Sequence, residues 1–165
     1  MIRAIGPYPP VEAERHNAVY AEMMLGNIGG KNSELSTVAH YRYNRLMTAE
    51  EHGELSELMH KISVVEMQHF DLFGRLAKLL GADPRMWQSV GCKKKYWTPG
   101  YVDYEYESLR DMLQKLLDEE RGAIKKYTAQ LGCIQDAKVA AVLKRVIEDE
   151  REHVKTWEEE IAKLG

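Results

Sequence analysis

The sequence predicts an all-α protein: a four-helix bundle with one long crossover between its second and third helices, preceded by an extended arm and a short helix. Three observations support this fold class. Apolar residues recur at steps of three and four along four long segments. One pattern of polar residues occurs twice, once in each half of the chain. The connections between the segments are short, long and short, which is a topology that such bundles adopt.

The N-terminal part is expected to lie outside the bundle. Three prolines among the first ten residues predict an extended arm. A short helix is expected from about Val11 to Leu25, where Gly26 would end it. We therefore assign residues 1–30 to the arm and short helix, and residues 31–165 to a single bundle domain, which is long enough to bury a core.

Caps and glycines predict the limits of the first two bundle helices. Asn32 or Ser33 can cap a helix that runs to about Met47. A second helix is expected over residues 50–80, with Gly81 just beyond its end. Because the connection between them is short, the two helices should be antiparallel neighbours.

Residues 84–107 show no clear periodicity and are expected to form the crossover loop. These roughly 24 residues, at up to ~3.3 Å each, can return the chain along the bundle. The lysines at 93–95 are expected to be a solvated loop and not a binding patch. A third helix then carries the apolar stripe from Leu113 to Leu131, and a fourth runs from Ala137 to Leu164.

A carboxylate and an imidazole interrupt the apolar stripe of the second long helix. Glu66 and His69 occupy positions that the spacing assigns to the core. Residues three apart lie on one helix face, so both side chains can reach a single point. A buried carboxylate needs a partner or must stay protonated. Glu-x-x-His inside a core stripe is how helical bundles hold two metal ions.

The motif occurs a second time, as Glu150 and His153 at the centre of the last apolar stripe. Each copy also has a companion glutamate on the preceding helix: Glu34 before the first copy and Glu120 before the second. Four helices therefore supply four glutamates and two histidines. This set is the ligand inventory of di-metal carboxylate bundles.

We predict that these six residues bind two metal ions. By the geometry of this class, Glu66 and Glu150 would bridge the ions, and Glu34 with His69 and Glu120 with His153 would be the terminal ligands. Four carboxylates neutralise two divalent ions, so the metal-free form should be less stable or hold protonated carboxyls. Such ligands suit iron, manganese or zinc. Only a redox-active pair, two Fe or two Mn ions, would react with two-electron oxidants. The alternative interpretation is that the six residues bind no metal and are structural residues of the core.

Residues beside the expected ligands allow two interpretations each. Asp149 either orients His69 through its far ring nitrogen or is solvated. Tyr41 and Tyr127 either hydrogen-bond to ligand carboxylates or fill the core. The other histidines lie off the apolar stripes and are expected at the surface: His16, His40, His52 and His60.

Charge and composition exclude several classes of function. The net charge of −3 argues against nucleic acid as a partner. No window approaches the ~18 apolar residues of a membrane span, and the first residues carry no apolar signal-peptide core. Cys92 and Cys133 form neither a Cys-x-x-Cys motif nor a disulfide framework, which favours reduced thiols in a cytoplasmic protein.

The six predicted ligands resemble those of the ferritin-like di-metal carboxylate superfamily, from about residue 30 onward. The resemblance implies a ferritin-like four-helix bundle. Within that superfamily, residues 29–36 are similar to the opening of the first ligand helix in manganese catalases and their spore-coat relatives. This similarity implies peroxide disproportionation. The chain departs from the larger manganese catalases in its short crossover and in lacking a C-terminal extension.

The pattern also resembles rubrerythrins, which implies a di-iron peroxidase. The rubrerythrin pattern has a second glutamate three residues after the third-helix ligand, where this chain has Ala123. A rubredoxin domain is missing as well, so an electron donor would have to be a separate protein. Met67 resembles the haem-ligating methionine of bacterioferritin, although a methionine here is also ordinary packing. The few residues after His153 leave no room for the fifth helix of a ferritin cage.

The expected function is that of a dinuclear manganese or iron oxidoreductase that disproportionates or reduces hydrogen peroxide. A ferroxidase or iron-handling protein and a non-catalytic structural protein of coat type are the alternatives. The expected partners are H2O2 or O2 and, for a peroxidase, an electron-donor protein. The bundle is expected to form a dimer or a higher homo-oligomer. Metal, reaction and oligomeric state stay open at this level, because one fold supports many functions.

Overall fold

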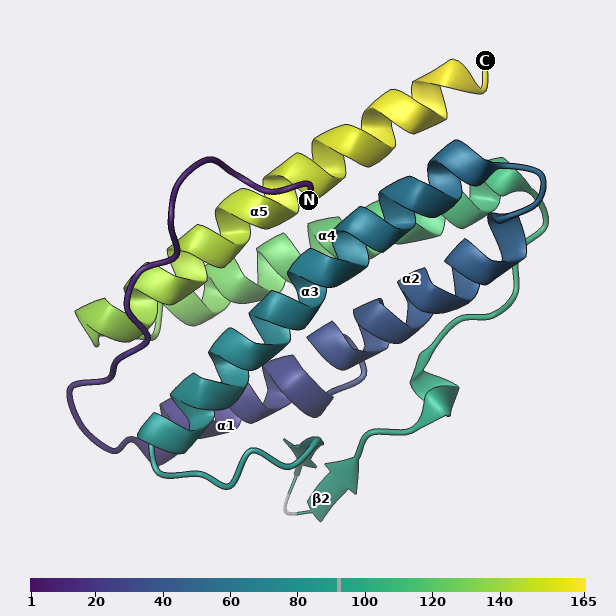
Figure 1. Cartoon of the computed structure of the whole chain (residues 1–165). Coiled ribbons are helices and arrows are strands. Elements are labelled where there is room, and N and C mark those ends of the chain that lie inside the picture. Colours follow the sequence, from purple (N-terminus) through teal and green to yellow (C-terminus); the bar gives the residue numbers. More distant parts are fainter. Residues whose placement is uncertain (92) are drawn as a thin grey trace.

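The computed structural model describes residues 1–91 and 93–165, so Cys92 lies outside the described residues. Four long helices form an elongated bundle: α2 (Glu34–Thr48), α3 (Gly53–Leu79), α4 (Leu109–Leu131) and α5 (Ala137–Lys163) (Figure 1). The chief partner of α2 is α3, and that of α4 is α5. The predicted all-α bundle with a single long crossover between the second and third bundle helices is confirmed.

Side-chain caps explain where three of these helices begin. The Ser33 hydroxyl accepts the Ser36 N–H, as expected, and the Ser108 hydroxyl accepts the Asp111 N–H. The carboxylate of Asp136 accepts two backbone N–H groups at the start of α5. These bonds satisfy donors that the first turn of a helix leaves unpaired.

The short N-terminal helix is displaced from its predicted limits. Helix α1 (Ala18–Gly29) begins after Asn17, whose side chain accepts the N–H groups of the first turn, and it continues through Gly26. A glycine inside a helix costs about 1 kcal/mol relative to alanine. Here the burial of three large side chains that flank Gly26 outweighs that cost: Met24 and Leu25 before it and Ile28 after it. Residues 1–17 form an extended arm that lies along α5 (Figure 1).

The crossover contains strands that the sequence reading missed. Strand β1 (Trp87–Val90) pairs antiparallel with β2 (Lys93–Tyr96), and a 3-10 turn, η1 (Pro99–Tyr101), follows. The lysines at 93–95 are exposed, as expected, but they belong to a strand and not to a loop. The Lys94 ammonium lies 4.5 Å from the centre of the Trp87 ring. This cation–π contact stabilises a hairpin whose sequence lacks the usual alternation.

Helix α1 and strand β1 approach so closely that only glycine fits between them. A Cβ on Gly29 would lie 2.3 Å from the backbone nitrogen of Trp87. Farther along, the Trp97 indole N–H donates to the Ser36 hydroxyl at 3.0 Å. These contacts fasten the crossover to α1 and to the start of α2.

The hydrophobic core divides into two clusters along the bundle. One contains Phe73 and Leu143, and the other contains Met59, Leu113 and Trp157. In both α3 and α5 the Glu-x-x-His motif falls between these clusters, so an inward-facing polar layer has an apolar layer on each side. Within the part of the chain that the structure describes, no helix combines the length and apolarity needed to cross a membrane.

Candidate metal centre

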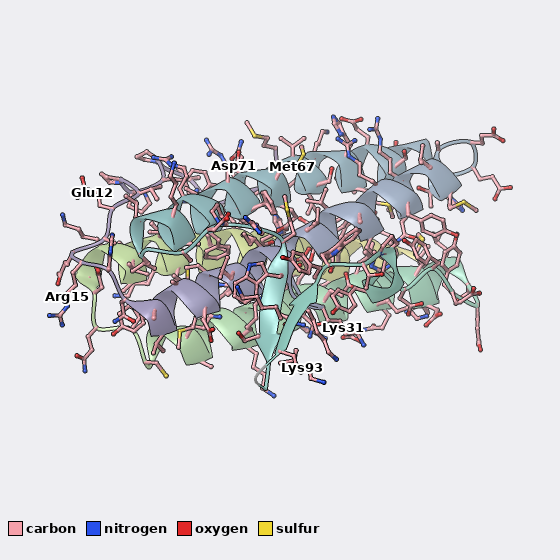
Figure 2. All side chains as sticks on the ribbon, turned by 90° about the horizontal axis from the view of Figure 1, so that it is seen from below. Glu12, Arg15, Lys31, Met67, Asp71 and Lys93 are labelled. Atoms are coloured by element: carbon pink, nitrogen blue, oxygen red, sulfur yellow. The ribbon has the colours of Figure 1, made fainter. Side chains whose placement is uncertain are left out.

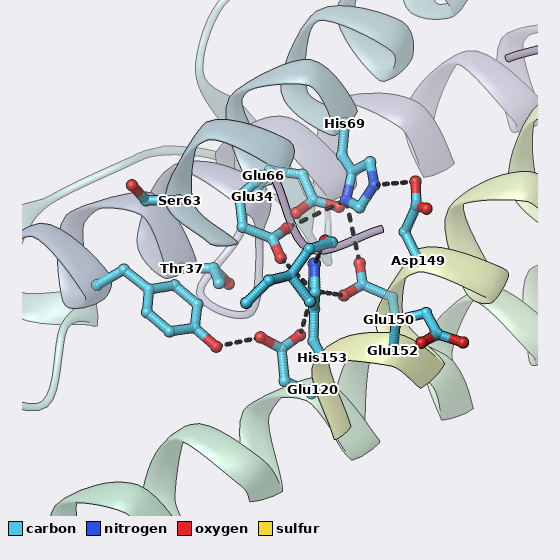
Figure 3. Close-up of polar contacts among 12 residues, drawn as sticks. Glu34, Thr37, Ser63, Glu66, His69, Glu120, Asp149, Glu150, Glu152 and His153 are labelled. Atoms are coloured by element: carbon cyan, nitrogen blue, oxygen red, sulfur yellow. Dashed lines mark hydrogen bonds and ion pairs between the residues drawn. The ribbon is translucent and has the colours of Figure 1, made fainter. Parts of the chain in front are cut away.

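The six predicted ligands converge in the interior of the bundle (Figure 3). Glu66 and His69 point inward from α3, and Glu150 and His153 point inward from α5; all four are buried. Glu34 is the first residue of α2, and Glu120 lies in the middle of α4. Both are also buried, so the structure brings four carboxylates and two imidazoles into one closed space.

These residues form two overlapping groups of potential ligand atoms. The first comprises Glu34, Glu66, His69 and Glu150; the second comprises Glu66, Glu120, Glu150 and His153. Within each group, one ligand atom per residue lies within 4.8 Å of all the others. The two groups share Glu66 and Glu150, so two ions held here would be bridged by those carboxylates.

Both histidines turn the same ring nitrogen toward the carboxylates. His69 Nδ1 lies 3.1 Å from Glu66 Oε2 and 3.3 Å from Glu150 Oε1. His153 Nδ1 lies 2.9 Å from Glu66 Oε1 and 3.1 Å from Glu150 Oε2. A metal ion placed between these atoms would therefore meet an imidazole nitrogen and oxygens of both shared glutamates.

The far nitrogens of the histidines meet oxygen acceptors. Asp149 Oδ2 lies 3.1 Å from His69 Nε2, so the aspartate is in place to orient that ring. The carbonyl oxygen of Ile2 lies 2.9 Å from His153 Nε2. Such outer contacts fix the ring orientation and tautomer of metal-binding histidines.

The two tyrosines hydrogen-bond to carboxylates, but across the repeat. The Tyr41 hydroxyl of α2 donates to Glu120 of α4, and the Tyr127 hydroxyl of α4 donates to Glu34 of α2. The Trp157 indole N–H in turn donates to the Tyr41 oxygen at 2.7 Å. Each terminal glutamate is thus held by the opposite half of the chain.

The centre distributes its charge unevenly among the carboxyls. Burial, together with the neighbouring glutamates, raises the pKa of Glu34 and of Glu120 well above its usual value. Burial also acts to raise the pKa of Glu66 and Glu150, but the two histidines outweigh it and lower both values.

The histidines behave in the opposite way. Burial acts to lower the pKa of His69 and His153, but the carboxylates outweigh it and raise both values well above the usual one. Without metal, these shifts favour imidazolium ions beside ionised Glu66 and Glu150, and they favour the protonated carboxyls of Glu34 and Glu120.

The donor set fits a pair of divalent cations. Glu66 Oε1 and Glu150 Oε1 are buried, and a histidine Nδ1 lies 2.9 Å and 3.3 Å from them, but neither oxygen accepts a well-aligned hydrogen bond from a residue that the structure describes. These oxygens and the two Nδ1 atoms are therefore left facing one another across the centre, where a cation could bind between them. Four carboxylates with two imidazoles match the oxygen and nitrogen ligands that iron and manganese take in helical bundles.

Comparison with known proteins assigns the chain to a family. The model of the ferritin-like domain matches residues 34–165, which span all four long helices. The chain belongs to the ferritin-like domain family. It is 22% identical to a probable manganese catalase of Clostridium acetobutylicum, over 93% of this chain and 75% of that protein.

Solved structures share the ferritin-like fold. KatB, a manganese catalase from Anabaena, superposes with a TM-score of 0.84 at 19% identity, over 100% of this chain and 81% of that one. The bacterioferritin of Desulfovibrio desulfuricans, described with a diiron site, superposes with a TM-score of 0.75 at 22% identity, over 89% of this chain and 80% of that one. Family membership and the carboxylate–histidine cluster together support a dinuclear metal protein.

One histidine of this ferritin-like chain was predicted wrongly. His40 is buried, not exposed, and its Nδ1 lies 2.9 Å from Glu119 Oε2. The prediction failed because a polar residue off the apolar stripe can still lie under a neighbouring helix if a charged partner satisfies it. His16 and His52 are exposed and His60 is half-buried. Met67 is partly exposed on the outer side of α3 (Figure 2).

Two side chains near the centre escaped the sequence reading. Tyr8 donates to Asp149 Oδ2 at 2.7 Å, and Arg145 donates to Asp149 Oδ1. Burial acts to raise the pKa of Asp149, but hydrogen bonds from His69, Arg145 and Tyr8 outweigh it and lower the pKa to about 2. The contact of Arg145 could have been predicted from the sequence, since Arg145 lies four residues before Asp149 on one helix face. The contact of Tyr8 could not, because a loop residue has no periodicity.

A cavity of about 340 Å³ opens between α2 and α4 and extends to Tyr127, whose hydroxyl donates to Glu34 of the centre. Thr37 and Ala123, each three residues after a terminal glutamate, line its walls together with Gly122. These side chains are small. The rubrerythrin pattern would place a glutamate at position 123, and the alanine leaves that space open.

Proposed function

We propose that this protein is a non-haem dinuclear manganese or iron oxidoreductase that disproportionates or reduces hydrogen peroxide. One observation carries the proposal: two buried ligand groups share Glu66 and Glu150, which suits two ions at bridging distance. The similarity to proteins named as manganese catalases supports peroxide as the substrate. A bound redox-active pair supplies two-electron chemistry, each ion changing by one electron.

The residues around the centre have distinct tasks in this proposal. Glu66 and Glu150 would bridge the ions, Glu34 with His69 would complete one site, and Glu120 with His153 the other. The phenols of Tyr41 and Tyr127 hold one oxygen of each terminal carboxylate, which fixes its orientation. In this proposal H2O2 would enter through the cavity between α2 and α4, which extends to Tyr127 beside Glu34.

The decisive experiment measures metal content and gas exchange on the same sample. We expect two Mn or Fe ions per chain and release of O2 from H2O2 without a reductant for a catalase. A peroxidase would consume H2O2 only with an electron donor, which would be a separate protein. A metal-loaded protein that leaves H2O2 unchanged under both conditions would contradict the proposal.

Removing one bridging carboxylate tests the site itself. Glu150→Gln should lose both ions and at least about 100-fold in peroxide turnover, since outer partners alone are worth 10- to 100-fold in metal affinity and a shared ligand is worth more. Glu152→Gln is the matched control, because this exposed glutamate lies two residues away on the same helix (Figure 3). Equal activity of both variants would rule out catalysis at this centre.

A ferroxidase is the second candidate function, and the similarity to a bacterioferritin with a diiron site favours it over a purely structural role. Ferroxidase activity would appear as O2 uptake that depends on added Fe(II). A non-catalytic coat-type protein would show neither activity, and its assembly would be unchanged in Glu150→Gln. We also propose a homo-oligomer, which sedimentation of the purified protein tests.

A further inference from the structure

We propose that the N-terminal arm positions the histidines of the metal centre and thereby controls how firmly the metal is held. The arm has no helix or strand over residues 1–17, yet residues 2–8 lie against the polar layer of the bundle. This inference rests on the proposed metal centre and concerns groups outside the ligand set.

The arm contacts one histidine directly. The Ile2 carbonyl oxygen can only accept a hydrogen bond, so His153 must carry its proton on Nε2. In the neutral ring this leaves the lone pair on Nδ1, the nitrogen that faces Glu66 and Glu150. A backbone group of the arm therefore selects the tautomer that can bind metal.

The arm contacts the other histidine through Asp149. The Ala4 N–H donates to Asp149 Oδ1 at 2.8 Å, and the Tyr8 hydroxyl donates to Oδ2 at 2.7 Å. Because Arg145 also donates to this carboxylate, Asp149 acts as an acceptor throughout and receives the Nε2–H of His69. The same nitrogen, Nδ1, is left to face the centre on both rings.

Further contacts hold this part of the arm in place. Arg145 donates to the Ala4 carbonyl at 2.8 Å and lies over the Tyr8 ring, 4.6 Å from its centre. The Tyr8 ring meets the His69 ring edge-on, with centroids 6.4 Å apart. One extended segment thus covers the outer side of both histidines, one from α3 and one from α5.

The test uses three variants of the full chain. Deletion of residues 2–6 removes the Ile2 carbonyl and the Ala4 N–H, and Tyr8→Phe removes one hydroxyl. Glu12→Gln is the control: Glu12 belongs to the same arm, but its contact is an exposed ion pair with Lys138 at 2.6 Å, away from the centre. Each protein is loaded with Mn²⁺ and mixed with excess EDTA, and the rate of metal release is measured.

We expect the deletion to release Mn²⁺ about 10- to 100-fold faster than the parent protein, in line with the effect of losing outer partners of metal ligands. Tyr8→Phe should have a smaller effect and Glu12→Gln none. Release from the deletion variant at the parent rate would overturn the inference.

Proton NMR separates positioning from simple stabilisation. In the Zn²⁺-loaded protein, the Nε2–H protons of His69 and His153 should exchange slowly with water. The deletion should speed exchange at both rings, and Tyr8→Phe should affect His69 alone. If the arm only stabilised the fold, Tyr8→Phe and Glu12→Gln would lower the melting temperature equally. The Nε2–H exchange of His69 would then not be faster in Tyr8→Phe than in Glu12→Gln. That result would also overturn the inference.

The outcomes separate this inference from the proposed function. A protein that holds two ions, shows fast release in the deletion variant and leaves peroxide unchanged supports the arm and contradicts the activity. A protein that consumes peroxide with the same release rate in all variants contradicts the arm alone. A parent protein that binds no ions contradicts both.

Discussion

The two sides of the metal centre differ in how they are closed. On the side of α3 and α5, the N-terminal arm lies over both histidines and hydrogen-bonds to the groups around them. On the side of α2 and α4, small side chains border a cavity that reaches Tyr127. The helices of the two halves repeat one sequence pattern, so the repeat by itself does not produce this difference. Segments outside the repeat differ between the two sides: the N-terminal arm covers one, and Tyr101 and Asp103 of the crossover line the cavity on the other.

The two sides also differ in the residues that they contribute to the centre. The closed side carries His69 and His153, the proposed nitrogen ligands, whose orientation needs fixed outer partners. The open side carries the terminal glutamates, each held by a tyrosine from the opposite half. In the proposed function, peroxide would therefore approach from the carboxylate side and leave the histidine contacts undisturbed.

Among the tests of this comparison, filling the open side should have the largest effect on activity. Ala123→Phe places a large ring in the cavity wall, and we expect kcat/KM for peroxide to fall at least about tenfold, which corresponds to ~1.4 kcal/mol in the barrier. The metal content should stay unchanged, because no ligand is altered. Ala129→Phe is the control, since this residue is exposed on the same helix and does not line the cavity. Unchanged kcat/KM in Ala123→Phe would show that substrate enters elsewhere.

Metal loading should be strongly pH-dependent. The raised pKa values of Glu34, Glu120, His69 and His153 mean that the metal-free centre holds protons near neutral pH. Binding of metal ions should displace protons from these carboxyls and imidazoles, so the metal affinity falls as the pH falls. Titration with Mn²⁺ in weakly buffered solution measures this release. Binding without acidification would contradict the charge distribution.

The stability of the metal-free protein should follow from the same pKa shifts. Groups with a raised folded-state pKa stabilise the fold at low pH, and this contribution is lost as the pH rises through that pKa. Asp149, Glu66 and Glu150 have lowered pKa values, so their contribution is lost as the pH falls. The metal-free protein should therefore have a maximum in melting temperature, whereas the Mn²⁺-loaded protein should stay stable toward alkaline pH. If the melting temperatures of the metal-free and Mn²⁺-loaded forms changed with pH in the same way, this prediction would be contradicted.

The attachment of the crossover should affect the free energy of unfolding. Gly29→Ala places a Cβ 2.3 Å from the Trp87 nitrogen and should destabilise the protein by about 1–3 kcal/mol. Gly26→Ala is the matched control on the same helix: its Cβ meets no atom within 4 Å, and it should stabilise by about 0.5–1 kcal/mol. Denaturant unfolding measures both. Equal shifts in the two variants would mean that the hairpin yields to the added methyl group.

The sequence predicted much of the fold because the bundle is encoded by local patterns. The helical period located the four long helices, and the Glu-x-x-His motifs inside apolar stripes showed which polar groups face inward. The limits of α1 and the hairpin were missed because tertiary contacts decide them: burial carries α1 through Gly26, and Trp87 with Lys94 supports a strand that lacks alternation.

The sequence by itself determined which six side chains meet, since spacing along a helix fixes the direction of a side chain. Only the tertiary structure decided what surrounds them. Tyr41 and Tyr127 reach across to the opposite half, His40 is buried against Glu119, and the Ile2 carbonyl meets His153. These contacts join residues far apart in the chain, and one is made by a backbone atom that every residue type possesses. No periodicity or composition can encode such a contact, so it exists only once the chain has folded.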